Sequence, residues 1–388
     1  MRRIRFLLWI AAGALPLLGS GDAWALPRFS ARYEQNCGLC HVNPTGGGQR
    51  TLYATQFIMP TEMSLTSYTP EQLAAVDPQL SKNVTIGLDM RTMHHHADRH
   101  SIPYGNFLQM EGAVDLTFQP DPHVVGYVSK GLTAGSQAYG LEAYGLLYVL
   151  PFNGYAKVGW FVPPFGWRFD DHTAFVRQKA LSASNSAADL DGPPAPNNDV
   201  GVEFGIFPQR LALTAAVLNG DPGANLDNNN APAYAAQGIY RVNLAGLGIG
   251  LGGSFWSNAE PGGRRQAAGP YGYLKWSGVT WLAESDWSRL RTADAQGNQV
   301  GSTTMWAVSQ ELSIPLHRGI ELRGTYDSFD PDIHAKTGAR FRYGAGFDVI
   351  PWPFVDILAT LNVHHFKLGH AVAGQDYTQS EIQLHFFY

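Results

Sequence analysis

Apolar and polar residues alternate along most of the chain between residues 84 and 388. In 108–118, every second residue is apolar or small, and polar residues stand between them. The stretch 381–388 repeats this pattern and ends on an aromatic residue. A period of two residues is typical of a β-strand with two unlike faces. One apolar and one polar face suit the wall of a transmembrane β-barrel, which meets lipid on one side and the lumen on the other.

The alternation predicts about sixteen strands, an even number as in single-chain bacterial barrels. Tight connections alternate with mostly longer ones, except for a short connection around Gly135 where a long one is due. The longest connection covers 163–198, and 159–166 with 170–172 resembles the start of the inward-folding loop of bacterial porins. The strands are expected near residues 84–93, 106–118, 123–133, 138–150, 154–162, 199–207, 210–219, 235–243, 246–257, 268–276, 279–290, 303–314, 319–329, 339–349, 354–366 and 377–388.

The composition supports an all-β membrane protein. Charged residues make up 15% of the chain, against about 25% in an average soluble domain. After residue 25 no uninterrupted apolar run reaches the roughly twenty residues that a helical span needs. The formal net charge of -5 argues against nucleic acid as a partner.

The first residues have the organisation of a secretory signal peptide. A basic start at 2–5 precedes an apolar stretch at 6–18 and an A-x-A cleavage site at 23–25. The apolar stretch is too short to cross a bilayer as a helix, although a retained anchor is the alternative. The prediction is a signal peptide at 1–25, a small module at 26–82 and a barrel at 83–388.

The chain contains two cysteines, and both lie in the pentapeptide Cys37-Gly38-Leu39-Cys40-His41. C-x-x-C-H is the attachment signature of a c-type haem, in which both thiols bind the porphyrin and the histidine binds the iron. A local disulfide and a zinc half-site are the alternatives, but no further cysteine is present to complete a zinc site. We therefore expect one covalent haem c held by Cys37, Cys40 and His41.

The module at 26–82 is predicted to be small and mainly helix and loop, with a short capped helix that starts near Thr69 and ends before Pro78. Met59 or Met63 is the candidate distal ligand of the haem iron. A histidine of the barrel wall and an open distal position remain alternatives.

Seven of the thirteen histidines fall in two stretches, which would lie near the outer rim of the barrel. Imidazole clusters bind transition metals, so we consider a surface metal cluster, with incidental histidines of polar loops as the alternative. The residues are His94, His95, His96, His100, His364, His365 and His370. Acidic residues on the lumen face would favour the entry of cations: Glu111, Asp115, Glu203, Glu321, Asp327, Asp348 and Asp356.

A signal peptide, one C-x-x-C-H near the mature N-terminus and a sixteen-strand barrel together resemble the fused monohaem cytochrome–porins of the outer membrane. The resemblance implies a cytochrome module that plugs its own barrel, and the best-known members of that family oxidise extracellular Fe(II). It leads us to expect electron transfer between an extracellular metal ion, as donor or acceptor, and a soluble periplasmic cytochrome. The chain would lie in the outer-membrane lipid of a Gram-negative bacterium, and an even strand number would place both termini in the periplasm.

Two other functions stay open. The first is a solute porin whose accessory haem module acts as a sensor or an electron acceptor. The second is a haem with an open distal site that acts catalytically, for instance as a peroxidase.

Overall fold

The computed structural model describes residues 27–99, 102–132, 141–167, 174–177, 198–220, 229, 231–260, 263–294, 298–335, 338–366 and 376–388. The predicted signal peptide at 1–25 lies outside this range. Among the described residues, no helix is both long enough and apolar enough to cross a membrane.

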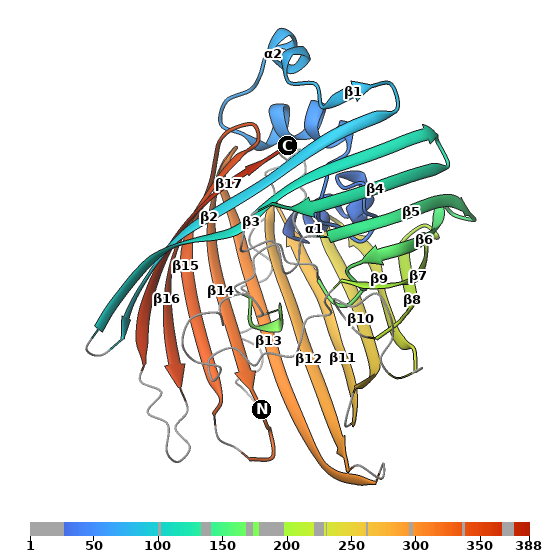
Figure 1. Ribbon diagram of the computed structural model, residues 1–388. Helices are drawn as coiled ribbons and strands as arrows, with labels where there is room; N and C mark the ends of the chain where they lie inside the picture. Colours follow the sequence, from blue (N-terminus) through green and yellow to red (C-terminus); the bar gives the residue numbers. More distant parts are fainter. Residues whose placement is uncertain are drawn as a thin grey trace, which may run out of the picture.

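Sixteen antiparallel strands form one closed barrel (Figure 1). Each strand from β2 to β17 pairs with the next, and β17 closes the barrel by pairing with β2. Every one of the sixteen predicted strands is confirmed, and only β1 (Gln79–Ser81), paired with β2, adds to them. The strands are β2 (Val84–Arg99), β3 (Ile102–Asp121), β4 (Val124–Gly131), β5 (Leu141–Leu150), β6 (Gly154–Phe161), β7 (Asp199–Ile206), β8 (Leu211–Leu218), β9 (Ala233–Leu244), β10 (Leu247–Glu260), β11 (Gly263–Trp276), β12 (Val279–Ala293), β13 (Gln299–His317), β14 (Ile320–Asp330), β15 (Arg340–Trp352), β16 (Val355–Phe366) and β17 (Tyr377–Phe387).

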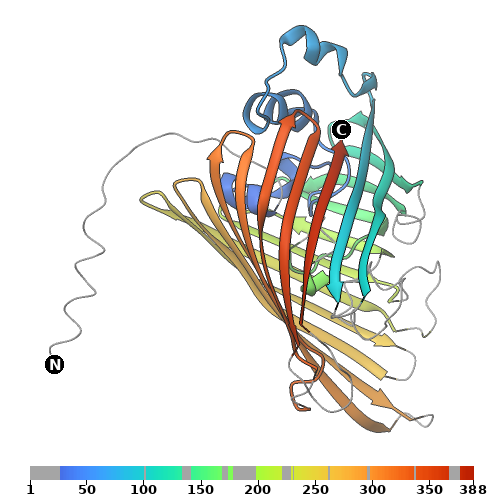
Figure 2. The ribbon, with the colours of Figure 1, turned by 90° about the vertical axis from the view of Figure 1, so that its left-hand side faces the viewer.

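The two ends of the barrel differ. At one end, which we name the short-turn end, tight turns reverse the chain through residues with positive φ, such as Asn153, Gln209 and Gly278. Positive φ gives a hairpin turn the twist that matches the right-handed twist of its strands. The C-terminus lies at this end, and the longer connections lie at the other, the long-loop end (Figure 2).

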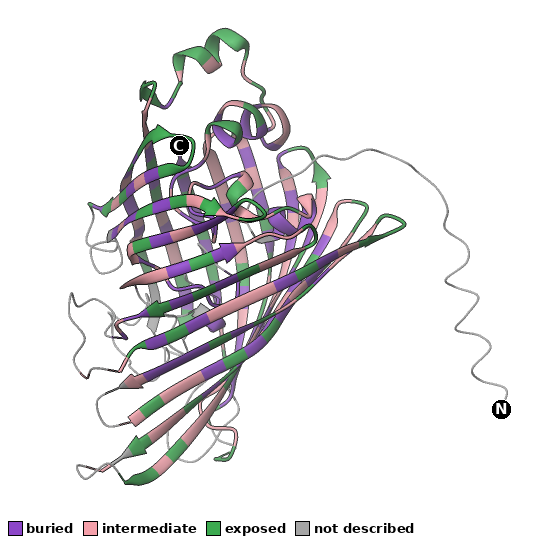
Figure 3. Cartoon of the chain, turned by 90° about the vertical axis from the view of Figure 1, so that its right-hand side faces the viewer, coloured by how far each residue is buried: buried purple, intermediate pink, exposed green. Residues whose placement is uncertain are grey.

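The wall has its apolar face outside and its polar face inside. In β17, the side chains of Ile382, Leu384 and Phe386 are exposed, whereas Glu381 and Gln383 are buried in the lumen. Buried and exposed residues alternate in the same way along the other strands (Figure 3). This reversal of the usual soluble pattern is typical of a barrel that meets lipid.

In β3, the alternation predicted the lumen-facing residues correctly after Met110 but wrongly before it. The pairing with β2 shifts there by one residue, because Arg91 pairs with Glu111 and Thr92 with Gln109. A β-bulge reverses which residues face the lumen. Residues such as Phe107, which is 79% exposed, therefore face outward in place of their even-numbered neighbours.

The N-terminal segment enters the barrel at the short-turn end (Figures 1 and 2). Residues 27–50, which we call the plug, include helix α1 (Pro27–Tyr33) and the short 3-10 helix η1 (Cys37–Leu39). The π-helix η2 (Ala54–Met63) follows the plug, and α2 (Pro70–Ala75) protrudes from the same end. The side chain of Thr69 caps α2 as predicted.

Two described parts of the connection between β6 and β7, 163–167 and 174–177, also lie in the lumen. The backbone N–H of Trp167 donates to Glu284 on β12 at 2.9 Å, and that of Phe175 donates to Asp327 on β14 at 3.3 Å. Phe175 begins the short helix η3 (Phe175–Arg177). The expectation of an inward loop is therefore confirmed for 163–167 and 174–177, while residues 170–172 lie outside the described part of the chain.

Candidate functional site

The C-x-x-C-H sequence forms one compact turn inside the lumen. The backbone N–H groups of Cys40 and His41 both donate to the carbonyl of Cys37, at 3.0 and 2.9 Å. Neither cysteine takes part in a disulfide. Both thiols and the histidine are thus presented by five consecutive residues.

His41 is buried, and one of its ring nitrogens has a partner in the plug. Its Nδ1 lies 3.4 Å from the carbonyl oxygen of Gly48, so that in the Nδ1–H tautomer the ring donates there. A histidine that binds a metal commonly donates its other ring N–H to a carbonyl, which fixes the ring for ligation through Nε2. Gly46, Gly47 and Gly48 all have positive φ, and this turn brings the chain back to His41.

Cys40 packs in an apolar cluster together with Met59 and Met63. Burial raises the pKa of the Cys40 thiol to about 12, so the thiol is protonated at neutral pH. Both methionines are buried on η2, whose Pro60 lies between them. The structure therefore brings both candidate distal residues next to the cysteine turn, and ligation by either stays a prediction.

These residues fit a covalent haem c. Cys37 and Cys40 would hold the porphyrin through its vinyl groups and His41 would bind the iron, while methionine and aromatic side chains supply an apolar environment. When bound, the haem would supply one-electron chemistry at its iron.

Two arginines of α1 hold the plug to the charged wall of the barrel. Arg28 forms ion pairs with Glu311 (3.3 Å), Glu321 (3.4 Å) and Asp348, and Arg32 forms one with Glu321. All of these side chains are largely buried. Removing one member of a buried pair typically costs about 3–5 kcal/mol, so these contacts fix the plug firmly.

The rest of the plug is bound by other strands. Arg50 forms an ion pair with Asp89 at 3.2 Å, and Asp89 also accepts from His385 at 2.8 Å. Further contacts with the plug come from several other strands, among them Thr117 (β3) with Gln49, Tyr127 (β4) with Gln49, Glu142 (β5) with Asn43, Arg241 (β9) with Asn36, and Lys275 (β11) with Glu34. The plug is thus held from many sides.

The acidic residues that were expected to attract cations are mostly engaged by protein cations. Glu321 and Asp348 bind the plug, Asp327 binds Arg342 at 2.6 Å, and Glu203 binds Lys157 at 2.6 Å. These arginine and lysine partners were not predicted from the sequence. The spacing of Arg28 and Arg32, four residues apart on one helix face, was the signal that could have indicated a paired contact.

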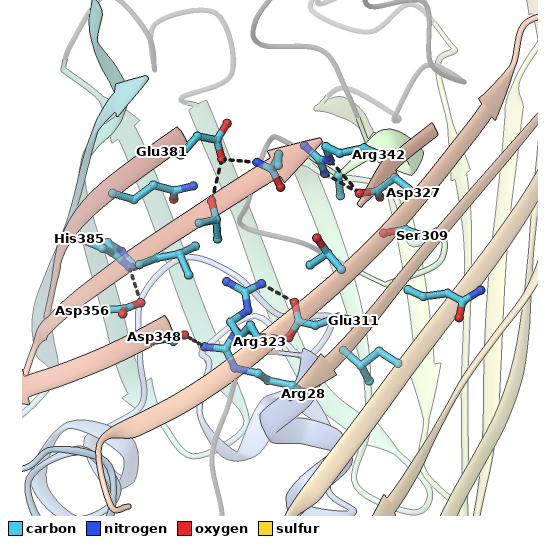
Figure 4. A pocket seen from close by; sticks show the side chains of 18 of the residues that line it. Arg28, Ser309, Glu311, Arg323, Asp327, Arg342, Asp348, Asp356, Glu381 and His385 are labelled. Atoms are coloured by element: carbon cyan, nitrogen blue, oxygen red, sulfur yellow. Dashed lines mark hydrogen bonds and ion pairs between the residues drawn. The ribbon is translucent and has the colours of Figure 1, made fainter. Parts of the chain in front are cut away.

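A polar chamber lies between the plug and the inward loop, on the side of β12 to β17 and β2 (Figure 4). Arg28 of the plug and Ala174 of the inward loop both line it. Arginines and carboxylates from neighbouring strands point toward one another inside it, among them Arg323 with Glu311. The side chains of the described residues therefore leave part of the lumen unfilled.

The structure separates the two histidine stretches. Strand β17 lies between β2 and β16, so the two stretches lie two strands apart rather than on adjacent strands. Strand β2 continues to Arg99, and His94, His95 and His96 therefore lie within it rather than beyond its end. His94 packs against the exposed ring of Phe107, and alternation places His95 on the opposite face.

The second stretch is divided in the same way. His364 is buried in the lumen, whereas His365 is exposed and bonds Asp376 at 2.7 Å. No group of three or more histidine, cysteine, aspartate or glutamate residues within the described part of the chain could hold a metal ion. His100 and His370 lie outside that part, so a metal site that includes them stays a prediction.

The barrel resembles solved outer-membrane porins and channels. An anion-selective porin from Comamonas acidovorans matches with a TM-score of 0.57 at 10% identity, covering 79% of this chain and 99% of that one. OprB of Pseudomonas putida matches with a TM-score of 0.55 at 6% identity, covering 84% and 99%. The outer-membrane channel DcaP of Acinetobacter baumannii matches with a TM-score of 0.53 at 11% identity, covering 81% and 100%. At these identities the likeness establishes a porin-type fold.

Neither a protein-family model nor a curated protein sequence matches the chain. The Comamonas protein is described as an anion-selective porin and DcaP as an outer-membrane channel, and none of the three structures is described as a cytochrome. The resemblance to fused cytochrome–porins stays a prediction.

Proposed function

We propose that this chain is an outer-membrane barrel that carries one haem c on its plug and passes electrons between an external metal ion and a periplasmic cytochrome. The porin-type fold supports the location in the outer membrane. The short-turn end, where the C-terminus lies, would face the periplasm, as short turns do in bacterial barrels.

The position of Cys37, Cys40 and His41 inside the lumen is the observation that carries the proposal. The hydrocarbon layer that such a barrel crosses is about 25 Å thick, too thick for efficient electron transfer from a haem beyond the end of the barrel. A haem on the plug would shorten the distance to an external donor. The chamber above the plug would let a small hydrated ion approach it.

The second candidate is a solute porin with an accessory haem, and the structural neighbours favour it. It requires an open path through the lumen. The contacts of the plug with strands on many sides of the barrel argue against a wide path. Conductance therefore separates the two candidates.

The experiment compares the wild-type chain with the double variant Cys37→Ser/Cys40→Ser, both folded as barrels. The wild type should show a c-type pyridine haemochrome and little ion conductance in planar bilayers, and the variant should lose the covalent haem. A wild type that carries haem but conducts like an open porin would favour the second candidate. A wild type without covalent haem would overturn both.

A further inference from the structure

The ring of His41 is linked to the barrel wall through a single peptide group. The carbonyl of Gly48 faces His41 Nδ1 at 3.4 Å, and the N–H of the next residue, Gln49, donates to Tyr127 Oη at 3.2 Å. This carbonyl and this N–H belong to the same peptide unit, whose resonance couples them electronically. Tyr127 in turn donates its hydroxyl hydrogen to Asp115 Oδ1 at 2.9 Å.

The wall fixes this chain of hydrogen bonds. Tyr127 is 2% exposed and Asp115 is 1% exposed, and the ring of Tyr127 stacks on Tyr144 with centroids 4.8 Å apart. Gly48 has a φ of +66°, and a Cβ at its position would lie 2.2 Å from Tyr127 Oη. Only glycine lets the loop approach the tyrosine so closely. The side chain of Gln49 also accepts from Thr117 on β3, which holds the same peptide unit from a second strand.

We propose that Tyr127 and Asp115 are positioning residues of the barrel wall that tune His41 as an iron ligand. The inference rests on the proposed function, because it requires haem on Cys37, Cys40 and His41. Hydrogen bonds in a chain polarise one another in a buried site. A partner that accepts the second ring N–H of a ligating histidine raises the basicity of the ligand. The carboxylate of Asp115 thereby makes His41 a stronger electron donor, which favours Fe(III) and lowers the midpoint potential of the haem.

The test compares midpoint potentials from spectroelectrochemical titration of the purified holoprotein. Tyr127→Phe removes one oxygen atom and keeps the stacked ring, whereas Asp115→Asn keeps an acceptor and removes the charge. Mutation of the hydrogen-bond partner of a ligating histidine commonly changes metal affinity or activity tenfold or more. We therefore expect each variant to change the ratio of oxidised to reduced haem about tenfold at fixed potential, a rise of about 59 mV for one electron.

Tyr155→Phe is the matched control. Tyr155 is also a buried lumen tyrosine that donates to a carboxylate, Glu203, at 2.6 Å. Loss of the Tyr155 hydroxyl should lower the free energy of unfolding and leave the midpoint potential of the haem unchanged. The double variant Tyr127→Phe/Asp115→Asn should shift the potential no further than Tyr127→Phe alone, because members of one network are not additive.

Unchanged potentials in both single variants, with an intact c-type spectrum, would overturn the inference and leave the proposed function standing. Equal shifts in Tyr127→Phe and in the control would also overturn it, because they would reflect a general loosening of the wall. A wild type without haem would overturn the inference together with the proposed function.

Discussion

The wall formed by β4, β5 and β6 and the wall formed by β13, β14 and β15 hold the plug by different means. The first presents stacked aromatic rings, among them Tyr127 and Tyr144, and Tyr127 accepts a neutral hydrogen bond from the backbone N–H of Gln49, next to the glycine loop. The second presents carboxylates that bind Arg28 and Arg32 of α1. We expect the first wall to set the surroundings of His41 and the second to contribute most to the retention of the plug.

The largest effect is expected from Arg28→Met. Three buried carboxylates lose their shared cation, and uncompensated buried charge typically costs about 3–5 kcal/mol. The plug should loosen, and single-channel recordings should show a conductance that the wild type lacks. Arg289→Met is the control, because Arg289 is exposed and donates to the exposed Ser302 at 3.5 Å. Equal conductance in wild type and Arg28→Met would show that the charged wall does not retain the plug.

Lys157→Met tests the opposite wall. Lys157 and Glu203 are both fully buried and lie 2.6 Å apart, whereas Arg28 and Arg32 of the plug pair with Glu311, Glu321 and Asp348. The variant should lower the free energy of unfolding of the barrel by about 3–5 kcal/mol without opening the channel. Adding Glu203→Leu should restore most of the stability in urea titrations, because no unpaired charge then remains. An increase in conductance with Lys157→Met would show that the wall of β4, β5 and β6 also retains the plug, contrary to this expectation.

The alternation of residues was sufficient to predict every strand, because lipid and lumen impose opposite requirements on neighbouring side chains. The short connections between the strands predicted the tight turns, and the resemblance of 159–166 to the start of the inward-folding loop of porins predicted the inward course of the chain around Phe165. The alternation could not predict the bulge at Met110, because the bulge inserts one residue without changing the composition of the strand. The C-x-x-C-H motif identified the candidate site, but Tyr127 and its contact with Gln49 join residues 78 positions apart. Such contacts depend on how the plug docks in the barrel, and no local sequence pattern predicts that docking.

Met59→Leu and Met63→Leu have intermediate effects and resolve the distal position. Leucine has a similar volume, so each change should cost less than about 1.5 kcal/mol. Thioether ligation raises the potential of a haem. The variant that removes the ligand should therefore lower the midpoint potential and let added imidazole or cyanide bind, while the other should behave as the wild type. If both variants behave as the wild type, the distal position of the haem iron is either occupied by a histidine of the barrel wall or open.

The smallest effect is expected from His94→Asn/His96→Asn. Alternation places these two side chains on the outer face, whereas His364 is buried in the lumen behind β17. The rate of haem reduction by external Fe(II) should stay unchanged. A marked slowing would show that the outer histidines take part in metal capture, with His100 or His370 completing the site.

Electron transfer across a sealed membrane tests the central claim most directly. Proteoliposomes would hold the protein in one orientation with a soluble cytochrome c enclosed, and Fe(II) would be added outside. We expect reduction of the enclosed cytochrome that depends on Cys37 and Cys40, in vesicles that retain a small enclosed dye. Escape of the dye, or reduction that persists equally in Cys37→Ser/Cys40→Ser, would contradict the account and favour a solute porin.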